Sequence, residues 1–244
     1  MAPRIVAVIP AAGIGSRFGA DRNKPFFSLF GKPLLAWTLA VFELLPEIDA
    51  VVPVVKEQDL MAAAELADRF GLRKVKRIVP GGKERQDSVR NGLEVISGEA
   101  DIVVIHDGAR PMVDHAIIRQ ALDAVEGSDG VIAAVPVKDT IKEARSEGDI
   151  LVVHSTLRRD VLFSVQTPQV FPYATIAEAH RRAFSEGLHA TDDAALVEHY
   201  GGRVRIVHGS YNNFKITTPE DIAVAEAVLR MQGIGGGAAT CERS

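Results

Sequence analysis

The chain has 244 residues, of which 47% are hydrophobic and 25% are charged, a balance typical of a globular protein with a substantial core. Its formal net charge is −4 and only 6% of its residues are aromatic, which argues against nucleic-acid binding, because such proteins usually carry a basic face and base-stacking side chains. The single cysteine can form no internal disulfide and no apolar run is long enough to span a bilayer, so we expect a cytoplasmic protein without membrane contact.

Apolar runs of strand character recur along the chain, with helical patterns between them. The runs are 5–10, 50–55, 75–80, 101–106, 131–137 and 204–207. Most are continuously apolar, as expected of strands covered on both faces in a mainly parallel sheet. The alternation predicts an α/β fold with an open, doubly wound, Rossmann-like sheet. We expect one domain over 1–231 and a flexible tail over 232–244.

Polar residues mark the expected starts of two helices. Ser88 is a plausible N-cap for a helix whose apolar stripe includes Val89 and Leu93. Thr218 is the expected N-cap of a second helix, with Pro219 at the first helical position and Asp221 closing a capping box.

The stretch 135–171 interrupts the alternation of strands and helices. Two extended segments, 137–142 and 150–155, flank the polar turn 146–149 and predict a β-hairpin arm over about 137–157. Such an arm either packs on its own domain or embraces a second subunit, and the second case predicts a homodimer.

A glycine-rich turn, "PAAGIGSRFG", directly follows the first apolar run and predicts a phosphate site built from backbone N–H groups. The dinucleotide fingerprint fails because Phe18 stands where its third glycine belongs, and no P-loop pattern is present. The pattern is instead A-A-G-x-G-x-R, ending at Arg17, followed by Lys24. Two cations at one site suit attack at a nucleotide α-phosphorus, whereas the alternative is a surface loop with two solvated cations.

Later loops offer further candidate ligands. "GGKERQDSVRNGL" predicts a second anion- or base-contacting loop, and "HDGARP" follows a strand at the edge where open α/β sheets bind ligands. Asp107 either faces a metal or a ribose or caps its own loop, and Thr191 is either a ligand or a helix N-cap. Lys215 lies at an apparent strand end. The seven histidines show no paired metal spacing and are expected to be structural or surface groups.

Taken in order, these stretches resemble the 2-C-methyl-D-erythritol 4-phosphate cytidylyltransferases, CTP-using enzymes of the non-mevalonate isoprenoid pathway. The resemblance runs from about residue 5 to residue 229. It rests on A-A-G-x-G-x-R with the distant lysine, G-G-x-x-R-x-x-S-V-x-x-G-L, H-D-x-A-R-P, D-T-I-K, Q-T-P-Q-x-F, T-D-D and F-K-I-T-x-P-x-D.

The resemblance implies a role for each matching residue. Arg17 and Lys24 would hold the triphosphate and stabilise the transition state, and the loop 82–88 would read the cytosine. The CTP site would be lined by Ala11, Ala12, Gly13, Gly15, Gly82, Lys83, Ser88, Asp107 and Gly108. Mg²⁺ would be held mainly by the CTP phosphates, with Asp107 beside them as a further candidate. The acceptor polyol phosphate would be gripped by Arg110, Thr140, Arg159, Thr167, Thr191 and Lys215.

In that family the arm is exchanged across a homodimer, so Thr140 and Arg159 would serve the partner's site, and Arg159 and Lys215 would orient the acceptor phosphate for attack. The chain departs from the common pattern at Pro25, at Lys83 and in the doublet Arg158-Arg159. Three alternatives stay open: a ribitol-5-phosphate cytidylyltransferase, a hexose-phosphate nucleotidyltransferase, and an inactive sugar-nucleotide-binding regulator.

Overall fold

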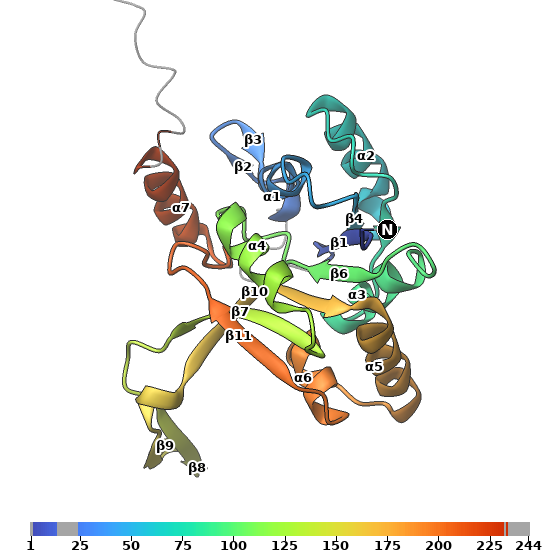
Figure 1. Cartoon of the computed structure of the whole chain (residues 1–244). Coiled ribbons are helices and arrows are strands. Elements are labelled where there is room, and N and C mark those ends of the chain that lie inside the picture. The colour runs from blue at the N-terminus through green and yellow to red at the C-terminus, as the bar shows by residue number, and fades with distance from the viewer. Residues whose placement is uncertain (1, 14–23, 232, 234–244) are drawn as a thin grey trace, which may run out of the picture.

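The computed structural model describes residues 2–13, 24–231 and 233. Their main sheet has seven strands in the order β11-β7-β10-β6-β1-β4-β5 (Figure 1). The strands are β1 (Ile5–Pro10), β4 (Ala50–Val55), β5 (Val79–Pro80), β6 (Ile102–Ile105), β7 (Gly130–Pro136), β10 (Phe163–Pro172) and β11 (Val204–His208). All pairs are parallel except those of β10, which is antiparallel to both β6 and β7. The predicted open, mainly parallel sheet is confirmed.

The central strand β1 shows why its sequence is apolar throughout. Val6 and Val8 pack into the core on one face of the sheet, and Ile5, Ala7 and Ile9 pack into the core on the other. Because side chains alternate between faces, a strand with helices on both sides must be apolar at every position.

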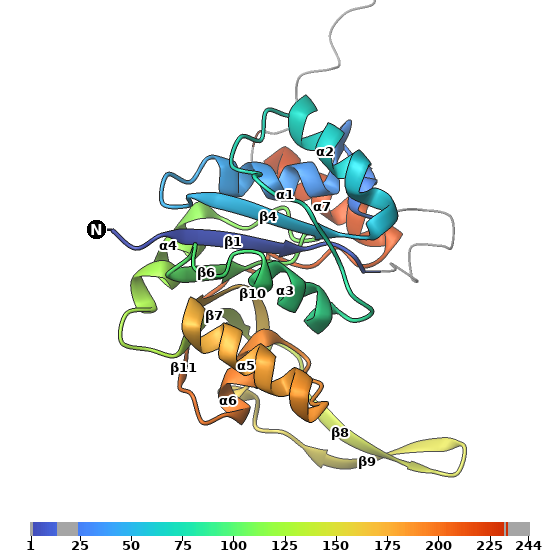
Figure 2. The ribbon, with the colours of Figure 1, turned by 90° about the vertical axis from the view of Figure 1, so that its right-hand side faces the viewer.

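Helices cover both faces of the sheet (Figure 2). One face carries α1 (Leu34–Glu43), α2 (Leu60–Arg69) and α4 (His115–Ala124), and the other carries α3 (Arg85–Glu94), α5 (Tyr173–Glu186) and α6 (Asp193–His199). The last helix, α7 (Pro219–Met231), shares a third apolar cluster with the short hairpin of β2 (Ser28–Leu29) and β3 (Lys32–Pro33). The 3-10 turns among the described residues are η2 (Lys24–Phe26), η3 (Glu57–Asp59) and η4 (Arg159–Val161). None of the helices in the described part of the chain has the length and apolar character needed to cross a bilayer.

A two-stranded hairpin of β8 (Lys142–Glu147) and β9 (Ile150–Thr156) extends away from the main sheet (Figures 1 and 2). The predicted arm is confirmed, but its first strand begins at Lys142 rather than at residue 137. The turn is also shorter than predicted, because Glu147 pairs directly with Ile150 and Gly148 has a φ of 64°. A two-residue hairpin turn requires positive φ, which glycine adopts without strain, so pairing extends up to Gly148.

Two strand predictions were wrong. Within 75–80 only Val79–Pro80 forms a named strand, and Lys215 lies in an irregular segment between β11 and α7 rather than at a strand end. Strand β10 was missed because buried polar residues, Gln166, Thr167 and Gln169, interrupt its apolar pattern, and its pairing with β7 is irregular at the same place. Their hydrogen bonds with other loops, described below, stabilise this polar stretch.

The helix starts also differ in part. Helix α3 begins one turn earlier than predicted: Glu84 is its N-cap, in a capping box with Asp87, so Ser88 is not the cap. Asp192, not Thr191, caps α6. At α7 the Asp221 carboxylate accepts from the Thr218 backbone N–H at 2.9 Å, as the capping box predicts.

Candidate active site

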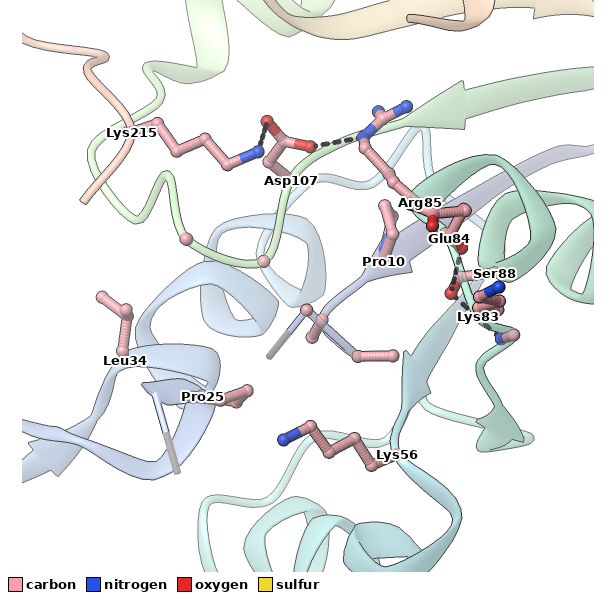
Figure 3. A pocket seen from close by; sticks show the side chains of 16 residues that line it. Pro10, Pro25, Leu34, Lys56, Lys83, Glu84, Arg85, Ser88, Asp107 and Lys215 are labelled. Atoms are coloured by element: carbon pink, nitrogen blue, oxygen red, sulfur yellow. Dashed lines mark hydrogen bonds and ion pairs between the residues drawn. The ribbon is translucent and has the colours of Figure 1, made fainter. Parts of the chain in front are cut away.

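A cavity of about 560 Å³ lies at the carboxyl ends of the central strands (Figure 3). It is formed by the loop after β1, the loop leading into α3 and the loop after β6. Eight residues predicted to bind CTP line it: Ala11, Ala12, Gly13, Gly82, Lys83, Ser88, Asp107 and Gly108. Gly15 and Arg17 lie outside the described residues, as does the side chain of Lys24. The structure therefore brings together the described part of the predicted nucleotide site.

Small residues let these loops approach one another closely. A Cβ on Gly81 would lie 2.3 Å from the Cβ of Ala12, and one on Gly108 would lie 2.9 Å from the Cβ of Ala11. Ser88 is buried beneath the loop, where its hydroxyl accepts from the Gly82 N–H at 3.2 Å and donates to the Glu84 carbonyl at 3.1 Å. Ser88 thus holds the shape of the loop.

Asp107 follows β6 and is the electrostatic centre of the site. Its Oδ1 accepts from Arg85 Nε at 3.0 Å, and its Oδ2 accepts from Arg110 Nε at 3.3 Å and from Lys215 Nζ at 3.0 Å. Burial acts to raise the pKa of Asp107, but the charges of Arg85, Lys215 and Arg110 outweigh it and hold this pKa far below its ordinary value. Asp107 is therefore ionised at all physiological pH values.

Arg85 joins Asp107 to a second buried carboxylate, and sequence reasoning gave it no role. Its Nη1 donates to Asp193 Oδ2 at 2.7 Å, and Asp193 Oδ1 contacts Nε2 of the buried His180 at 3.0 Å. Burial opposes ionisation of Asp193, but Arg85 and His180 hold the pKa of that carboxyl below its ordinary value. The only sequence signal for Arg85 was its place in the motif "GGKER".

His106 and Thr167 fix the backbone of Asp107 from beneath. His106 Nε2 lies 3.0 Å from the Arg110 carbonyl, which can only accept, so we assign the ring proton to Nε2. Burial lowers the pKa of His106 to about 4, so the ring is neutral and its Nδ1 accepts from the Thr167 hydroxyl at 3.0 Å. The same hydroxyl accepts from the Asp107 N–H at 3.0 Å. Thr167, one of the predicted acceptor ligands, therefore also holds the backbone of Asp107 in place.

A second cavity, of about 440 Å³, adjoins the first. Arg110, Thr167, Thr191 and Lys215, all predicted acceptor ligands, line it. Both cavities share Arg85, Asp107 and Lys215, so this row of charges forms the wall where they meet (Figure 3).

Buried amides support this second cavity. Asn213, which lies two residues before Lys215, donates through Nδ2 to Thr167 O at 2.8 Å, and Gln166 Nε2 donates to Ser210 O at 2.8 Å. These bonds tie β10 to the segment that carries Lys215.

Two predicted acceptor ligands lie apart from the cavities. Thr140 and Arg159 are exposed at the base of the arm, and neither lines either cavity in the described residues of one chain. Arg159 Nη1 donates to the Lys138 carbonyl at 2.7 Å, whereas Arg158 forms an ion pair with Asp160 at 2.7 Å.

Lys56, at the end of β4, lines the nucleotide cavity and adds a cation that sequence reasoning passed over (Figure 3). Among the described residues no group of three or more His, Cys, Asp or Glu side chains is placed to hold a metal ion. The site therefore offers mainly cations and backbone N–H groups, a chemistry suited to anionic ligands.

Comparison with known proteins agrees with this geometry. The family profile of 2-C-methyl-D-erythritol 4-phosphate cytidylyltransferase matches residues 5–231. A relative of that name from Geotalea uraniireducens is 46% identical over 93% of this chain and 97% of its own length. Another, from Halalkalibacterium halodurans, is 49% identical over 91% of this chain and 95% of its own length.

Solved structures agree with the sequence comparisons. The 4-diphosphocytidyl-2C-methyl-D-erythritol synthase of Anaerococcus prevotii superposes with a TM-score of 0.81 at 30% identity, covering 93% of this chain and 96% of that one. The cytidylyltransferase of Thermus thermophilus gives a TM-score of 0.74 at 33% identity, covering 91% of this chain and 98% of that one. The chain belongs to the 2-C-methyl-D-erythritol 4-phosphate cytidylyltransferase family.

Proposed function

We propose that this chain transfers the cytidylyl group of CTP to 2-C-methyl-D-erythritol 4-phosphate, giving 4-diphosphocytidyl-2-C-methyl-D-erythritol and pyrophosphate. Beside family membership, the observation that carries the proposal is the pair of adjoining cavities. One is lined by the loops that suit a nucleotide, the other by cations and hydroxyls that suit a polyol phosphate, and they share the wall of Arg85, Asp107 and Lys215.

The reaction is an in-line displacement at the α-phosphorus of CTP. A phosphate oxygen of the acceptor forms the new bond to phosphorus as the bond to pyrophosphate breaks. An ionised phosphate is already a nucleophile, so the chemistry requires neither a general base nor a covalent enzyme intermediate. Catalysis then consists of positioning the two anions and stabilising the charge that develops in the transition state.

On the nucleotide side, the close contact of the loops at Ala12 and Gly81 fixes one side of the cavity in which the nucleotide would bind. The loop at Gly82 and Lys83 lies over this cavity and would read the cytosine. Arg17 and Lys24 would neutralise the triphosphate and the departing pyrophosphate, and Lys56 adds a further cation to the cavity.

On the acceptor side, Lys215 and Arg110 supply positive charge, and the exposed hydroxyl of Thr191 faces the same cavity. Lys215 lines both cavities, so its ammonium is placed to orient the acceptor phosphate toward the nucleotide.

Mg²⁺ is proposed to enter the site bound to the phosphates of CTP, as Mg²⁺ commonly does. Both oxygens of Asp107 are occupied by the side chains of Arg85, Arg110 and Lys215, so Asp107 suits a bridging role between these cations better than direct coordination. When bound, the ion would offset phosphate charge during displacement.

The arm supports a homodimer. Its strand β9 exposes Ile150, Leu151 and Val153 at 62%, 77% and 58%, an apolar surface that a second copy of the chain can cover. Thr140 and Arg159, which lie at the base of the arm, would then complete the partner's acceptor site. We also propose a cytoplasmic location, because the proposed reaction consumes CTP.

Pyrophosphate release by the purified chain with Mg²⁺ tests the proposal. We expect turnover with CTP and 2-C-methyl-D-erythritol 4-phosphate, and far less with UTP or ATP. Turnover with ribitol 5-phosphate instead would support the proposed nucleotide chemistry but would show that the proposed acceptor is wrong. CTP binding without pyrophosphate release on any polyol phosphate would mean a binding protein.

A further inference from the structure

The wall between the two cavities contains Arg85, which pairs with Asp193, and the proposed reaction gives neither of these charged side chains a role. Three cations, Arg85, Arg110 and Lys215, meet two buried carboxylates, Asp107 and Asp193, so the group keeps a net positive charge. The side chain of Lys215 is 37% exposed, against 12% for Arg110 and 28% for Arg85. Lys215 is therefore the cation of this group that is most accessible to a ligand.

Asp107 holds Lys215 in the free protein, and this contact competes with any phosphate. Oδ2 of Asp107 is shared between Lys215 and Arg110, while Oδ1 is bound by Arg85. An acceptor phosphate that contacts the Lys215 ammonium competes with this carboxylate for its positive charge. How strongly Asp107 attracts Lys215 depends on how well the other cations neutralise Asp107.

Arg85 is held in place from the far side. Its Nη1 is fixed on Asp193, whose side chain is 1% exposed at the start of α6 and whose other oxygen contacts His180 on α5. A guanidinium can bind two carboxylates at once through different N–H groups, whereas a lysine ammonium is a single point charge. The Asp193 carboxylate thus connects Arg85 on α3 to His180 on α5.

We infer that Arg85 is a positioning residue for the acceptor: braced by Asp193, it neutralises Asp107 and so leaves the Lys215 ammonium available to the acceptor phosphate. This inference rests on the proposed function for the identity of the acceptor. Without Arg85, Asp107 retains only Arg110 and Lys215 and attracts Lys215 more strongly.

Kinetics of Arg85→Gln form the first test. We expect the KM for the acceptor to rise about 10- to 100-fold, the range for loss of a hydrogen bond to a charged group, while the KM for CTP changes less than about threefold. Asp193→Asn should shift the acceptor KM in the same direction by a smaller factor. Arg85→Lys should restore part of the loss, because the charge returns without the second contact.

The matched control is Arg90→Gln, on the same helix. Arg90 also pairs with two carboxylates, Asp87 and Glu94, but lies outside both cavities in the described residues. Arg90→Gln should leave both KM values unchanged. Equal shifts of the KM for CTP and for the acceptor in Arg85→Gln would indicate general damage to the site and overturn the inference.

A second-site test asks whether Arg85 acts through Asp107. In the Arg85→Gln background, Asp107→Asn removes the carboxylate that retains Lys215, so the acceptor KM should improve relative to Arg85→Gln alone. A further rise in that KM, or an additive loss, would contradict the inference.

Chemical modification supplies a readout that needs no substrate. Acetylation of Lys215 by acetic anhydride, followed by peptide mass spectrometry, should be about tenfold slower in Arg85→Gln than in the wild type or in Arg90→Gln, the factor that corresponds to about 1.4 kcal/mol of added pairing. Equal rates would overturn the inference. If the wild type shows this difference from Arg85→Gln but releases no pyrophosphate, the proposed function fails while the coupling of Arg85 to Lys215 stands.

Discussion

The Nζ atom of Lys215 lies 3.0 Å from Oδ2 of Asp107, although the two residues are far apart in the sequence. Asp107 follows the central strand β6, and Lys215 lies in the irregular segment that leads into α7. The backbone bond from the Ile216 N–H to the Ala109 carbonyl, at 2.9 Å, fixes the two segments side by side. Both residues line the nucleotide cavity and the acceptor cavity, so this contact lies where the two cavities meet.

Neutralising the carboxylate in Asp107→Asn should destabilise the chain, because it leaves three cations around a buried neutral amide. Breaking buried ion pairs from one side costs about 3–5 kcal/mol, and we expect a loss near the lower end because Lys215 can turn toward solvent. Urea unfolding at neutral pH measures this. Asp123→Asn, an exposed carboxylate on α4, should change the free energy of unfolding by less than about 0.5 kcal/mol. Equal effects of the two substitutions would show that the cluster adds no stability.

The buried, neutral ring of His106 should make stability depend on pH. Burial lowers its pKa in the folded state to about 4, while in the unfolded chain it is near the ordinary value of about 6.5. Between these values the unfolded state binds more protons, so the free energy of unfolding should fall by about 2 kcal/mol from about pH 7 to about pH 4.5.

Urea unfolding across that range, with His106→Gln as the comparison, isolates this contribution. The variant should be less stable at neutral pH but should show a flatter pH dependence between about pH 6.5 and pH 4.5. The depressed pKa values of Asp107 and Asp193 affect stability only at lower pH, below the ordinary aspartate value of about 3.9. Parallel pH profiles for the two proteins would rule out the assigned role of His106.

Gly81→Ala should impair nucleotide binding, because its Cβ would lie 2.3 Å from Ala12 and 2.9 Å from the Ser88 hydroxyl. One of the two loops must move, and we expect the KM for CTP to rise about tenfold or more. Gly92→Ala is the control: its Cβ would lie 2.5 Å from Val8 in the core, so it should lower stability without changing the KM for CTP. A raised KM in both variants would point to general unfolding instead.

Lys24→Ala should remove a transition-state contact worth about 3 kcal/mol or more, so kcat should fall by at least about 100-fold. Steady-state kinetics with varied CTP separates this from a binding effect. A normal kcat with a raised KM would mean that Lys24 binds the ground state and the transition state equally. Lys76→Ala, an exposed lysine before β5, should leave both constants unchanged.

Leu151→Asp on the arm should disrupt the proposed homodimer, because a carboxylate would replace a leucine that is 77% exposed in one chain and covered in the dimer. Sedimentation velocity should show a dimer for the wild type and a monomer for this variant. Met61→Asp, at a methionine with the same 77% exposure on α2, should remain dimeric. A monomeric wild type would remove the basis for Thr140 and Arg159 acting in a partner's site.

The sequence by itself determined the fold class and the continuously apolar strands of the sheet, because burial on both faces forces apolar residues at every position. Strands β1 and β4 were predicted to the residue, since nothing in their runs is polar. It also determined which loops form the nucleotide cavity, because phosphate-binding turns follow strands and need glycine or alanine where backbones approach closely.

Only the tertiary structure revealed the ion pairs of Arg85 with Asp107 and Asp193, because these partners lie on elements that are distant in the sequence. The same reason explains the missed strand β10: its polar residues are stabilised by hydrogen bonds to distant loops, such as that from Asn213 to Thr167, and not by local propensity. Ser88 and Thr191 were plausible helix caps by residue type. In the structure, Glu84 caps α3 and Asp192 caps α6, because the carboxylates of these residues accept hydrogen bonds from the free N–H groups of the first turn. Local patterns predict elements, whereas long-range charge pairing decides which side chains share a site.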